Sequence, residues 1–269
     1  MKTIFSDTDN QYMVANYQTM TYKDIATHLG FTERQIRGHL NNMGLTKKTS
    51  QLCENYFDII DTPEKSYFLG LMFADGYVVY NLQRRNYEAT LSLEQSDSDT
   101  VFAYAQALGI ADKITSRTRT ISFNGYMYDT TDCSARAYSR HLCDALINLG
   151  VVPNKTYRPE FPRPSVYLSS FVRGFLDGDG CIYTGTDGKS LSVSFTNSNR
   201  EFLMFLQSLL LEQTGAVGSL YTEKEWKHRL MFYALDDALA VLDWIYQPDG
   251  AWKMERKYQK YQTYLGLAA

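Results

Sequence analysis

Two short segments place carboxylates beside glycines at the ends of apolar runs. The first is "YFLGLMFADG" over residues 67–76, and the second is "FVRGFLDGDG" over residues 171–180. The apolar spacing predicts that each run is a helix, with Asp75 and Asp179 at its C-terminal end. A helix C-terminus carries partial negative charge from its unpaired carbonyls. A carboxylate there is therefore unfavourable unless a cation offsets it.

Small residues on the same two helices indicate how the acids come together. Gly70 and Ala74 lie four residues apart in the first helix, and Gly174 and Gly178 do so in the second. Small residues at this spacing let two helix backbones approach closely. Glycine inside a helix costs about 1 kcal/mol relative to alanine, so close packing is a good reason for its presence. We therefore expect the two helices to pack side by side.

Two carboxylates brought together in this way repel each other and recruit divalent cations. Hard oxygen ligands select Mg²⁺ or Ca²⁺, and Mg²⁺ is usually held by one or two carboxylates plus substrate phosphates. Two-metal phosphodiester hydrolysis needs this arrangement, with activated water on one side of the phosphorus and a stabilised leaving oxygen on the other. The pattern predicts that chemistry.

The surrounding sequence predicts two copies of one unit, each with the order helix, two strands, helix, two strands, helix. The copies span residues 62–164 and 165–269. In the first copy, Thr62-Pro63 starts the helix, and Gly76 is expected to end it with a left-handed residue. Turn signals then separate the strand pairs. They are Arg84-Arg85-Asn86, Asn124-Gly125, Asp187-Gly188 and Glu225-Trp226-Lys227.

Alternating residues in these strands predict an α+β fold in which two antiparallel sheets form a saddle. Leu191, Val193 and Phe195 should point to the helices, whereas the polar residues between them should lie on a free face. The two first helices would meet at a pseudo-twofold axis.

The first 48 residues predict a separate small all-α segment of three short helices. Thr21 can cap one helix, Gly30 ends it, and Thr32 with Gln35 forms a capping box for the next. Two short helices joined by a glycine turn outline a helix-turn-helix, whose second helix enters the DNA major groove. The exposed candidates on that helix are Arg34, Gln35, Arg37 and Asn41. A plain helical hairpin is the alternative, and residues 49–61 are expected to be a linker.

Composition limits the remaining classes. The net charge of −3 over 269 residues favours DNA binding only if positive charge is concentrated on one face. No apolar run reaches the roughly 20 residues that span a bilayer, and the start has no signal-peptide segment. The four cysteines form no CxxC pair. We expect a cytoplasmic protein with reduced thiols and no membrane partner.

The segments "FLGLMFADG" (68–76) and "VRGFLDGDG" (172–180) resemble the two motifs of a single-chain LAGLIDADG homing endonuclease. The likeness spans residues 62–265 and includes the strand order. It implies that Asp75 and Asp179 hold the metals and that the carbonyls of Ala74 and Gly178 add ligands. It also implies that Mg²⁺ is the cofactor, that Mn²⁺ substitutes, and that Ca²⁺ binds without supporting cleavage. The family motif also has an acid two residues earlier. The second motif keeps it as Asp177, whereas the first has Phe73 at that position.

The resemblance also implies catalytic side chains outside the motifs. Each half should place one lysine near the acids. The two candidates are Lys155 in "LGVVPNKT" and Lys257 in "MERKYQKY", and Lys253 is an alternative to Lys257. Such a lysine could stabilise charge on the phosphate or orient water. Matching "SLEQSD" with "SFTNSN" assigns the water-positioning role at the end of the second strand to Gln95 and Asn197.

The predicted DNA surface lies on the free face of the sheets and at their hairpin turns. A basic stripe should run along one strand, and polar residues should face DNA in the second copy. The stripe is Lys113, Thr115, Arg117 and Arg119; the polar pair is Ser192 and Ser194; the turn residues are Arg84, Arg85, Lys189, Lys224, Lys227 and Arg229.

The resulting functional hypothesis is a monomeric, intron-encoded or otherwise mobile homing endonuclease. It would cut both strands of a long, asymmetric double-stranded DNA site, with one acid for each strand. Two alternatives remain at this point. One is a DNA-binding transcriptional regulator that joins a helix-turn-helix to an inactive scaffold of the same fold, and the other is an RNA-splicing maturase.

Overall fold

The computed structural model describes residues 5–18, 20–45, 52–123, 125–185 and 190–266. The chain divides into two compact units, residues 1–51 and 52–269. None of the helices in the described ranges has the length and apolarity needed to cross a membrane.

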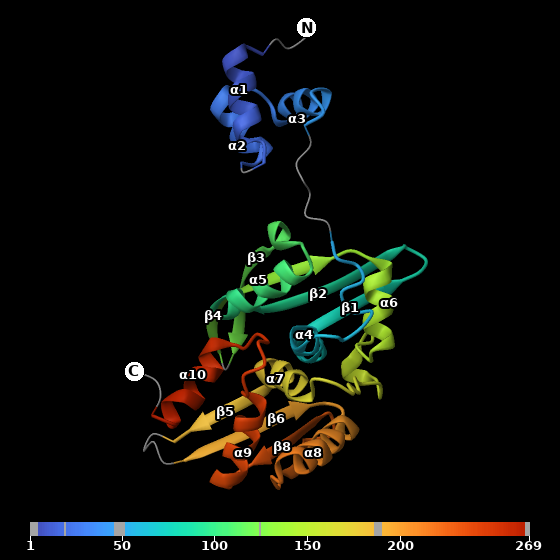
Figure 1. The fold of residues 1–269 in the computed structure, drawn as a ribbon, viewed down its shortest axis with the longest axis vertical. Coiled ribbons are helices and arrows are strands. Elements are labelled where there is room, and N and C mark those ends of the chain that lie inside the picture. Colours follow the sequence, from blue (N-terminus) through green and yellow to red (C-terminus); the bar gives the residue numbers. More distant parts are fainter. Residues whose placement is uncertain (1–4, 19, 46–51, 124, 186–189, 267–269) are drawn as a thin grey trace. The chain divides into compact units, whose positions relative to one another are not determined.

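The smaller unit contains three helices, which are α1 (Asp7–Asn16), α2 (Tyr22–Leu29) and α3 (Glu33–Asn42) (Figure 1). The predicted caps are confirmed, because Thr21 Oγ1 accepts a hydrogen bond from Asp24 N at 3.0 Å and Thr32 forms a capping box with Gln35. Gly30 ends α2 with a φ of 72°. The helices enclose a small apolar core made of Met13, Ile25, Ala26, Ile36 and Leu40.

The larger unit repeats one order of elements twice, as the sequence predicted. Its first half contains α4 (Pro63–Ala74), β1 (Gly76–Asn81), β2 (Asn86–Glu94), η1 (Gln95–Asp97), α5 (Ser98–Ala107), η2 (Ala111–Lys113), β3 (Thr115–Phe123), β4 (Tyr126–Ala137), α6 (Arg140–Asn148) and η3 (Lys155–Tyr157). Its second half contains α7 (Leu168–Asp179), β5 (Gly180–Thr184), β6 (Leu191–Asn197), α8 (Arg200–Thr214), β7 (Ser219–Lys224), β8 (Lys227–Phe232), α9 (Leu235–Ile245) and α10 (Glu255–Tyr264). Helix α10 was not predicted.

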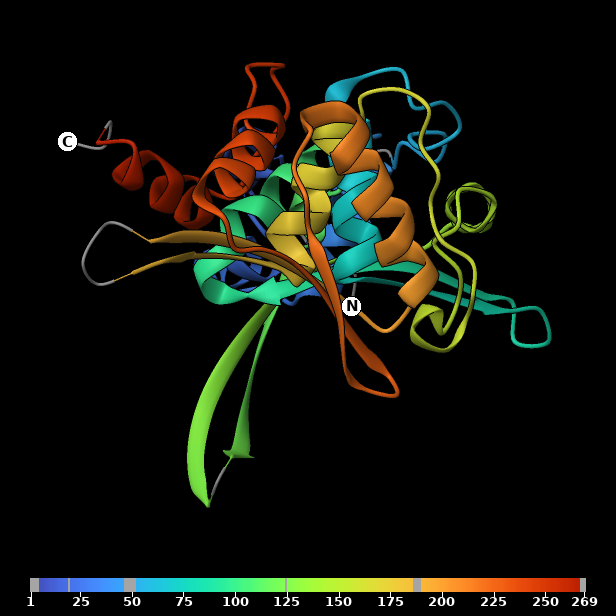
Figure 2. The same cartoon turned by 90° about the horizontal axis from the view of Figure 1, so that it is seen from below.

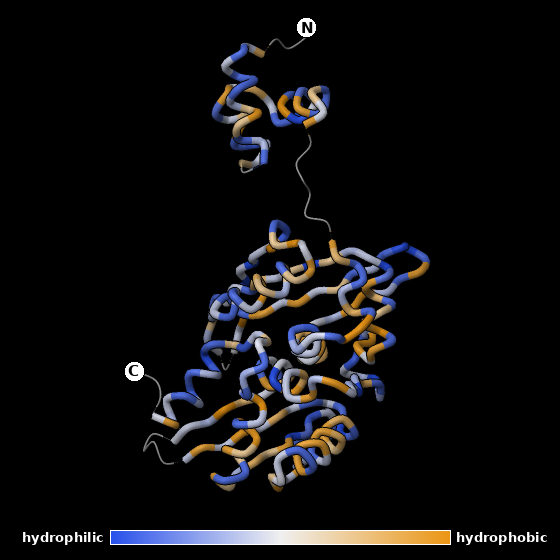
Figure 3. Tube along the Cα trace, in the orientation of Figure 1, coloured by the Kyte–Doolittle hydropathy of each residue, from blue (hydrophilic) through white to orange (hydrophobic). Residues whose placement is uncertain are grey.

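Each half contributes one antiparallel four-stranded sheet, with strand orders β1-β2-β4-β3 and β5-β6-β8-β7. The helices lie on one face of the sheets, and the other face is free (Figure 2). The predicted alternation is confirmed, since Leu191, Val193 and Phe195 are buried and the residues between them are partly exposed. Figure 3 shows this alternation as changes of colour along the strands.

Helices α4 and α7 pack against each other at the centre of the larger unit (Figure 1). A Cβ atom on Gly70 would collide with the carbonyl oxygen of Phe171, and one on Gly174 would collide with that of Tyr67. Gly178 in turn leaves room for the methyl group of Ala74. The predicted small-residue contact therefore holds the two backbones together and leaves no space for larger side chains.

Two expectations about chain breaks were wrong. Gly76 does not end α4 as a left-handed residue; Asp75 caps the helix with a φ of −101°, and Gly76 begins β1. Glycine is required there because a Cβ atom would lie 2.7 Å from the Met72 carbonyl oxygen. The expected linker over residues 49–61 also differs from the structure, since Phe57 is 1% exposed within the core of the larger unit.

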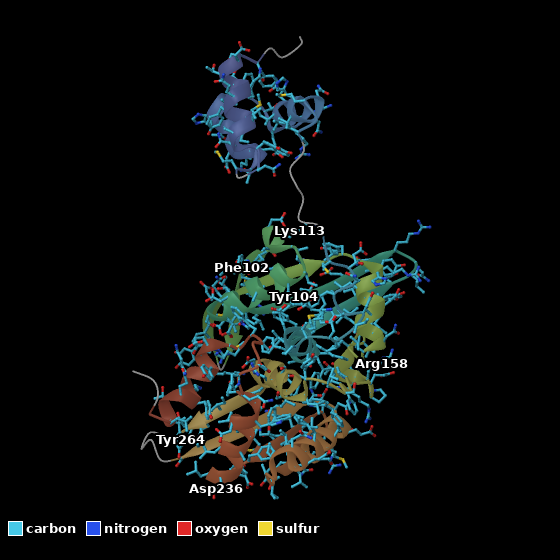
Figure 4. The ribbon with its side chains drawn as sticks, in the orientation of Figure 1. Phe102, Tyr104, Lys113, Arg158, Asp236 and Tyr264 are labelled. Carbon is cyan, nitrogen blue, oxygen red and sulfur yellow. The ribbon has the colours of Figure 1, made fainter. Side chains whose placement is uncertain are left out.

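Strands β3 and β4 extend beyond their sheet as a two-stranded ribbon (Figure 2). Strand β2 pairs with β4 only from Asp132 to Ala137, whereas β3 pairs with β4 along its whole length. Residues 115–122 are consequently exposed on both faces, rather than on the single free face that the sequence predicted. Lys113 lies in η2 before the strand, so it is not part of the predicted stripe (Figure 4).

Candidate active site at the ends of the paired helices

Asp75 and Asp179 lie at the C-terminal ends of α4 and α7, where the helix contact brings the two halves together. Burial raises the pKa of both carboxyl groups. The charge of Asp75 adds to this effect at Asp179, whose pKa rises to about 6. The two acids therefore interact electrostatically and share a region where ionisation is unfavourable.

A lysine lies beside each helix end and binds its free carbonyl groups. Lys155 Nζ donates hydrogen bonds to the carbonyl oxygens of Met72, at 3.3 Å, and of Gly76. Lys257 Nζ donates to those of Leu176 and Gly180, each at 2.7 Å. These ammonium groups offset the negative helix ends that the acids would otherwise meet alone.

Burial lowers the pKa of both Lys155 and Lys257 to about 8, although the nearby aspartates act in the opposite direction. Their charge lowers the pKa of both Asp75 and Asp179, against burial. Lys253, the competitor for the second position, lies instead over the ring of Tyr258 at 4.3 Å. The structure thus places Lys155 and Lys257 together with the acids.

Asp179 opens into a pocket of about 280 Å³. The lining comes from both halves and consists of Phe73, Ala74, Lys155, Thr156, Asp179, Thr196, Asn197, Ser198, Trp226 and Lys227. Asn197 forms a side-chain hydrogen bond with Asp179, which lowers the pKa of the acid. Asn197 Oδ1 accepts from the backbone N of Asn199 at 2.9 Å, so its amide group is held in place.

Asp75 opens into a second pocket, of about 380 Å³. Its lining is more highly charged and consists of Asp75, Ser92, Leu93, Glu94, Asp97, Arg119, Asp132, Asp177, Gly178, Met254 and Arg256. Two ion pairs neutralise part of it, Arg119–Asp132 at 2.8 Å and Arg256–Asp97 at 2.7 Å. Sequence reasoning missed this set, because Arg256 and Asp97 lie 159 residues apart and no local pattern connects them.

The polar residues predicted at the ends of the second strands differ in position. Asn197 lies in the Asp179 pocket, as expected. Gln95 does not line either acid pocket; it is exposed, and its Oε1 accepts from Ser116 Oγ at 3.2 Å. The expected symmetry therefore fails here, and Asp97 with Arg256 stands near Asp75 instead.

The oxygen atoms around the acids suit a hard divalent cation. Ala74 shares a pocket with Asp179, and Gly178 shares one with Asp75, so each acid adjoins the helix end of the opposite half. In the described part of the chain, no three acidic, histidine or cysteine side chains converge on one point. The protein thus offers one carboxylate from each half plus backbone oxygens, a set compatible with Mg²⁺ that keeps substrate and water ligands.

Asp177 and Phe73, at the earlier motif position, are structural. Asp177 is 1% exposed, and its Oδ2 accepts from Tyr67 Oη at 2.9 Å and from Met254 N at 2.8 Å. Phe73 packs on the rings of Phe175 and Phe202 in the core. Because Asp177 holds the segment before Lys257, its role is to support the site.

The predicted DNA-contacting residues are exposed to different degrees, and several are paired with acids. In the first half, Arg84, Arg85, Thr115 and Arg117 are exposed, whereas Arg119 is bound to Asp132. In the second half, Ser192 and Ser194 lie on the free face, and Lys224 packs over Trp226. Lys227 and Arg229 both pair with Glu223, at 2.8 and 2.9 Å. Lys189 lies outside the described residues.

In the smaller unit, Arg34, Arg37 and Asn41 are exposed on α3. Arg37 is paired with Glu33 at 2.6 Å, one turn earlier on the same helix. Gln35 is partly buried, and its Oε1 accepts from Thr32 N at 2.8 Å in the capping box. Three of the four predicted groove-reading residues are therefore accessible.

Comparisons with known proteins agree with this architecture. Residues 167–243 match the family described as a LAGLIDADG-like domain. The homing endonuclease I-WcaI, bound to its DNA recognition sequence, superposes with a TM-score of 0.51 at 12% identity, over 81% of this chain and 96% of that one. The homing endonuclease I-DmoI superposes with a TM-score of 0.49 at 14% identity, over 74% of this chain and 97% of that one. The meganuclease I-SmaMI, bound to DNA, superposes with a TM-score of 0.48 at 13% identity, over 76% of this chain and 89% of that one. No curated protein sequence matches the chain.

The larger unit thus has the LAGLIDADG fold, in the single-chain form with two halves, and its second half contains the matching domain. The resemblance expected from the two acid-glycine motifs is confirmed at the level of the fold.

Proposed function

We propose that this protein is a divalent-metal-dependent endonuclease that cuts both strands of a long, asymmetric DNA duplex. The observation that carries the proposal is the pair Asp75 and Asp179. They come from two halves, interact at the ends of packed helices, and each opens into a pocket and lies near a lysine whose charge lowers its pKa. Structural neighbours of the same fold include homing endonucleases bound to DNA, which supports a DNA substrate.

Asp75 and Asp179, with the carbonyl groups of Ala74 and Gly178, are the residues that would hold the cation. When bound, a divalent ion supplies Lewis-acid activation of water and of the scissile phosphate. Mg²⁺ is the proposed cofactor, with Mn²⁺ as a substitute and Ca²⁺ as a non-activating ligand; one structure of I-DmoI with its target DNA is described as being in the presence of Mn. Burial, together with the charge of Asp75 in the case of Asp179, raises the pKa of both acids, and a cation bound beside them would stabilise their ionised form.

The remaining site residues act on the phosphate and on water. Lys155 and Lys257 hold positive charge beside the acids, where it stabilises negative charge developing on the phosphate. A pKa of about 8 lets each lysine also give up a proton near neutral pH. Asn197, fixed through Asn199, orients the Asp179 carboxylate and a water in the same pocket.

The free faces of the two sheets would lie along the DNA major groove. Arg117 is exposed there and can read guanine, while Ser192 and Ser194 can bond to several bases. Arg84, Arg85 and Lys224 lie in or at the ends of hairpins, where they can contact phosphates. Arg119, Lys227 and Arg229 are each paired with an acidic side chain and would have to break that ion pair to contact DNA. They would therefore contribute more to the choice of DNA sequence than to the overall binding affinity.

The smaller unit would add a second DNA contact through α3. Its capped helix pair and the exposed Arg34, Arg37 and Asn41 support a helix-turn-helix role. Because phosphate contacts supply most non-specific affinity, this unit would increase DNA binding without taking part in the chemistry.

Cleavage of a randomised duplex library by the purified protein with Mg²⁺ tests the proposal. We expect discrete cuts that disappear in Asp75→Asn and in Asp179→Asn, with DNA binding retained in both. Selective binding without cuts would support the regulator alternative instead. Preferential binding of folded RNA over duplex DNA would support the maturase alternative, and full activity in both variants would exclude the two-acid mechanism.

A further inference from the structure

Arg256 stands in the Asp75 pocket in a fixed orientation. Its Nε and Nη2 donate to the two carboxylate oxygens of Asp97, at 2.7 and 2.8 Å. Such a two-point pair fixes the plane of the guanidinium as well as its position. Asp97 is 7% exposed, so this carboxylate is held within the protein while the arginine reaches outward.

The segment that carries Arg256 connects the two halves of the larger unit. Trp252 Nε1 donates to Thr100 Oγ1 of the first half at 3.2 Å, and Met254 N donates to Asp177 of the second half at 2.8 Å. Lys257 follows directly and binds the carbonyl groups at the end of α7. Arg256 is thus held in the Asp75 pocket by a segment that is anchored on both halves, directly before Lys257 in the chain.

Part of the guanidinium remains available to a ligand. The Arg256 side chain is 50% exposed, and its Nη1 takes no part in the pair with Asp97. Its charge lowers the pKa of Asp75, which places it within electrostatic range of that acid. Asp132 in the same pocket is already paired with Arg119, and the other acids of the lining besides Asp97 are Asp75, Glu94 and Asp177.

The Asp179 pocket contains no arginine among its lining residues in the described part of the chain. The residue before Lys155 is Asn154, which adopts a left-handed backbone with a φ of 57°. The segment around Lys155 is anchored by neutral groups, since Asn199 Nδ2 donates to the Pro159 carbonyl oxygen at 3.0 Å. Only one of the two acids therefore has a guanidinium in its pocket.

We propose that Arg256, oriented by Asp97, binds a phosphate of the DNA strand that is cut at the Asp75 site. The planar guanidinium matches phosphate oxygens better than an ammonium group does. The cut at the Asp75 site consequently depends on an arginine, whereas the cut at the Asp179 site does not. This inference rests on the proposed nuclease function for its effect on cleavage, but the phosphate contact itself can be tested without it.

The first test measures DNA binding without metal. In EDTA, the affinity of the full chain for duplex DNA is determined at several salt concentrations for the wild type, Arg256→Gln, Arg256→Lys and Arg140→Gln. Loss of one phosphate contact should lower the slope of log K against log salt by about 0.9 in Arg256→Gln. Arg140→Gln is the matched control, because it removes an arginine ion-paired to Asp144 on α6. An unchanged slope in Arg256→Gln would overturn the inference.

The second test follows each strand of a doubly labelled target duplex with Mg²⁺ under single-turnover conditions. Arg256→Gln should slow one strand by about 10²-fold and leave the other within a few-fold, since a lost charge-stabilising donor costs about that much. Asp97→Asn should slow the same strand less, and Arg256→Lys should recover part of the rate. Equal slowing of both strands would show a structural role and overturn the inference.

The two tests separate failure of this inference from failure of the proposed function. A wild-type protein that binds but does not cut, with a reduced slope in Arg256→Gln, would exclude the nuclease function and retain the phosphate contact. A wild-type protein that cuts, with an unchanged slope and strand ratio in Arg256→Gln, would exclude only the role of Arg256.

Discussion

The half with Asp75 and the half with Asp179 have the same hydrogen bonds to the backbone around the acid. In each, a lysine binds the carbonyl three residues before the acid and that of the glycine directly after it. The side chains around the acids differ. Asp179 has Asn197 as a hydrogen-bond partner, whereas Asp75 shares its pocket with Asp97 and Arg256.

This difference separates two kinds of constraint. Helices α4 and α7 are fixed by close packing, where even one added carbon on Gly70 or Gly174 would collide with backbone, so both halves must follow the same path. The strand ends point into open pockets, where several side chains fit without strain. Geometry is therefore shared between the halves, while the charge around each acid is set separately.

The largest expected effect comes from removing either acid. Asp75→Asn and Asp179→Asn should each lower the rate of double-strand cleavage by at least ~10³-fold, because several kcal/mol of transition-state stabilisation is lost. Strand-resolved rates at saturating Mg²⁺ provide the measurement. If the halves act independently, each variant should leave a nick in one strand, and the two nicks should lie on opposite strands. Loss of both cuts in each variant would show that the acids act as one unit.

The shared backbone geometry can be broken with one methyl group in either half. Gly70→Ala and Gly174→Ala should each lower the free energy of unfolding by about 3 kcal/mol or more, because the added carbon overlaps a carbonyl oxygen of the facing helix. Chemical denaturation measures the loss. Gly38→Ala on α3 meets open space and should gain up to about 1 kcal/mol. A loss confined to one of the two paired glycines would contradict the symmetric contact.

A pH series of unfolding in EDTA compares the acids directly. Burial and Asp75 raise the pKa of Asp179 to about 6, above its usual 3.8, so the folded state binds more protons than the unfolded state between these values. Stability should therefore fall as pH rises from about 4 to 6. Asp179→Asn should remove this loss and gain up to about 3 kcal/mol at pH 7. The gain from Asp75→Asn should be smaller, and no gain from Asp179→Asn would contradict the burial of its charge.

Deleting residues 1–51 should produce the smallest effect on chemistry. We expect DNA affinity to fall by about 10- to 100-fold, as when one of two linked binding units is removed. Both strand rates at saturating protein should stay within about two-fold of the full chain, since the active-site residues all lie in the other unit. Unequal loss of the two rates would mean that the smaller unit influences one half directly.

Much of the fold could be read from local patterns. Thr62-Pro63 predicted the start of α4, and the glycines at 70 and 174 predicted the helix contact, because these signals depend on nearby residues. The left-handed stop at Gly76 was wrong, and the structure places Lys113 and Gln95 elsewhere than the pattern predicted. Each depended on how a neighbouring segment turned or paired, which the residues beside it do not specify.

The sequence by itself determined the two acid-glycine motifs and the repeated order of elements, because spacing and periodicity encode local structure. The lysine in each half was implied only by the family resemblance, which left the second one open between Lys257 and Lys253. The tertiary structure alone decided that Lys257 rather than Lys253 binds the end of α7, and that Arg256 pairs with Asp97. It also decided that β3 and β4 leave their sheet as a free ribbon. These outcomes depend on contacts between residues that lie far apart in the sequence, and local patterns do not encode such contacts.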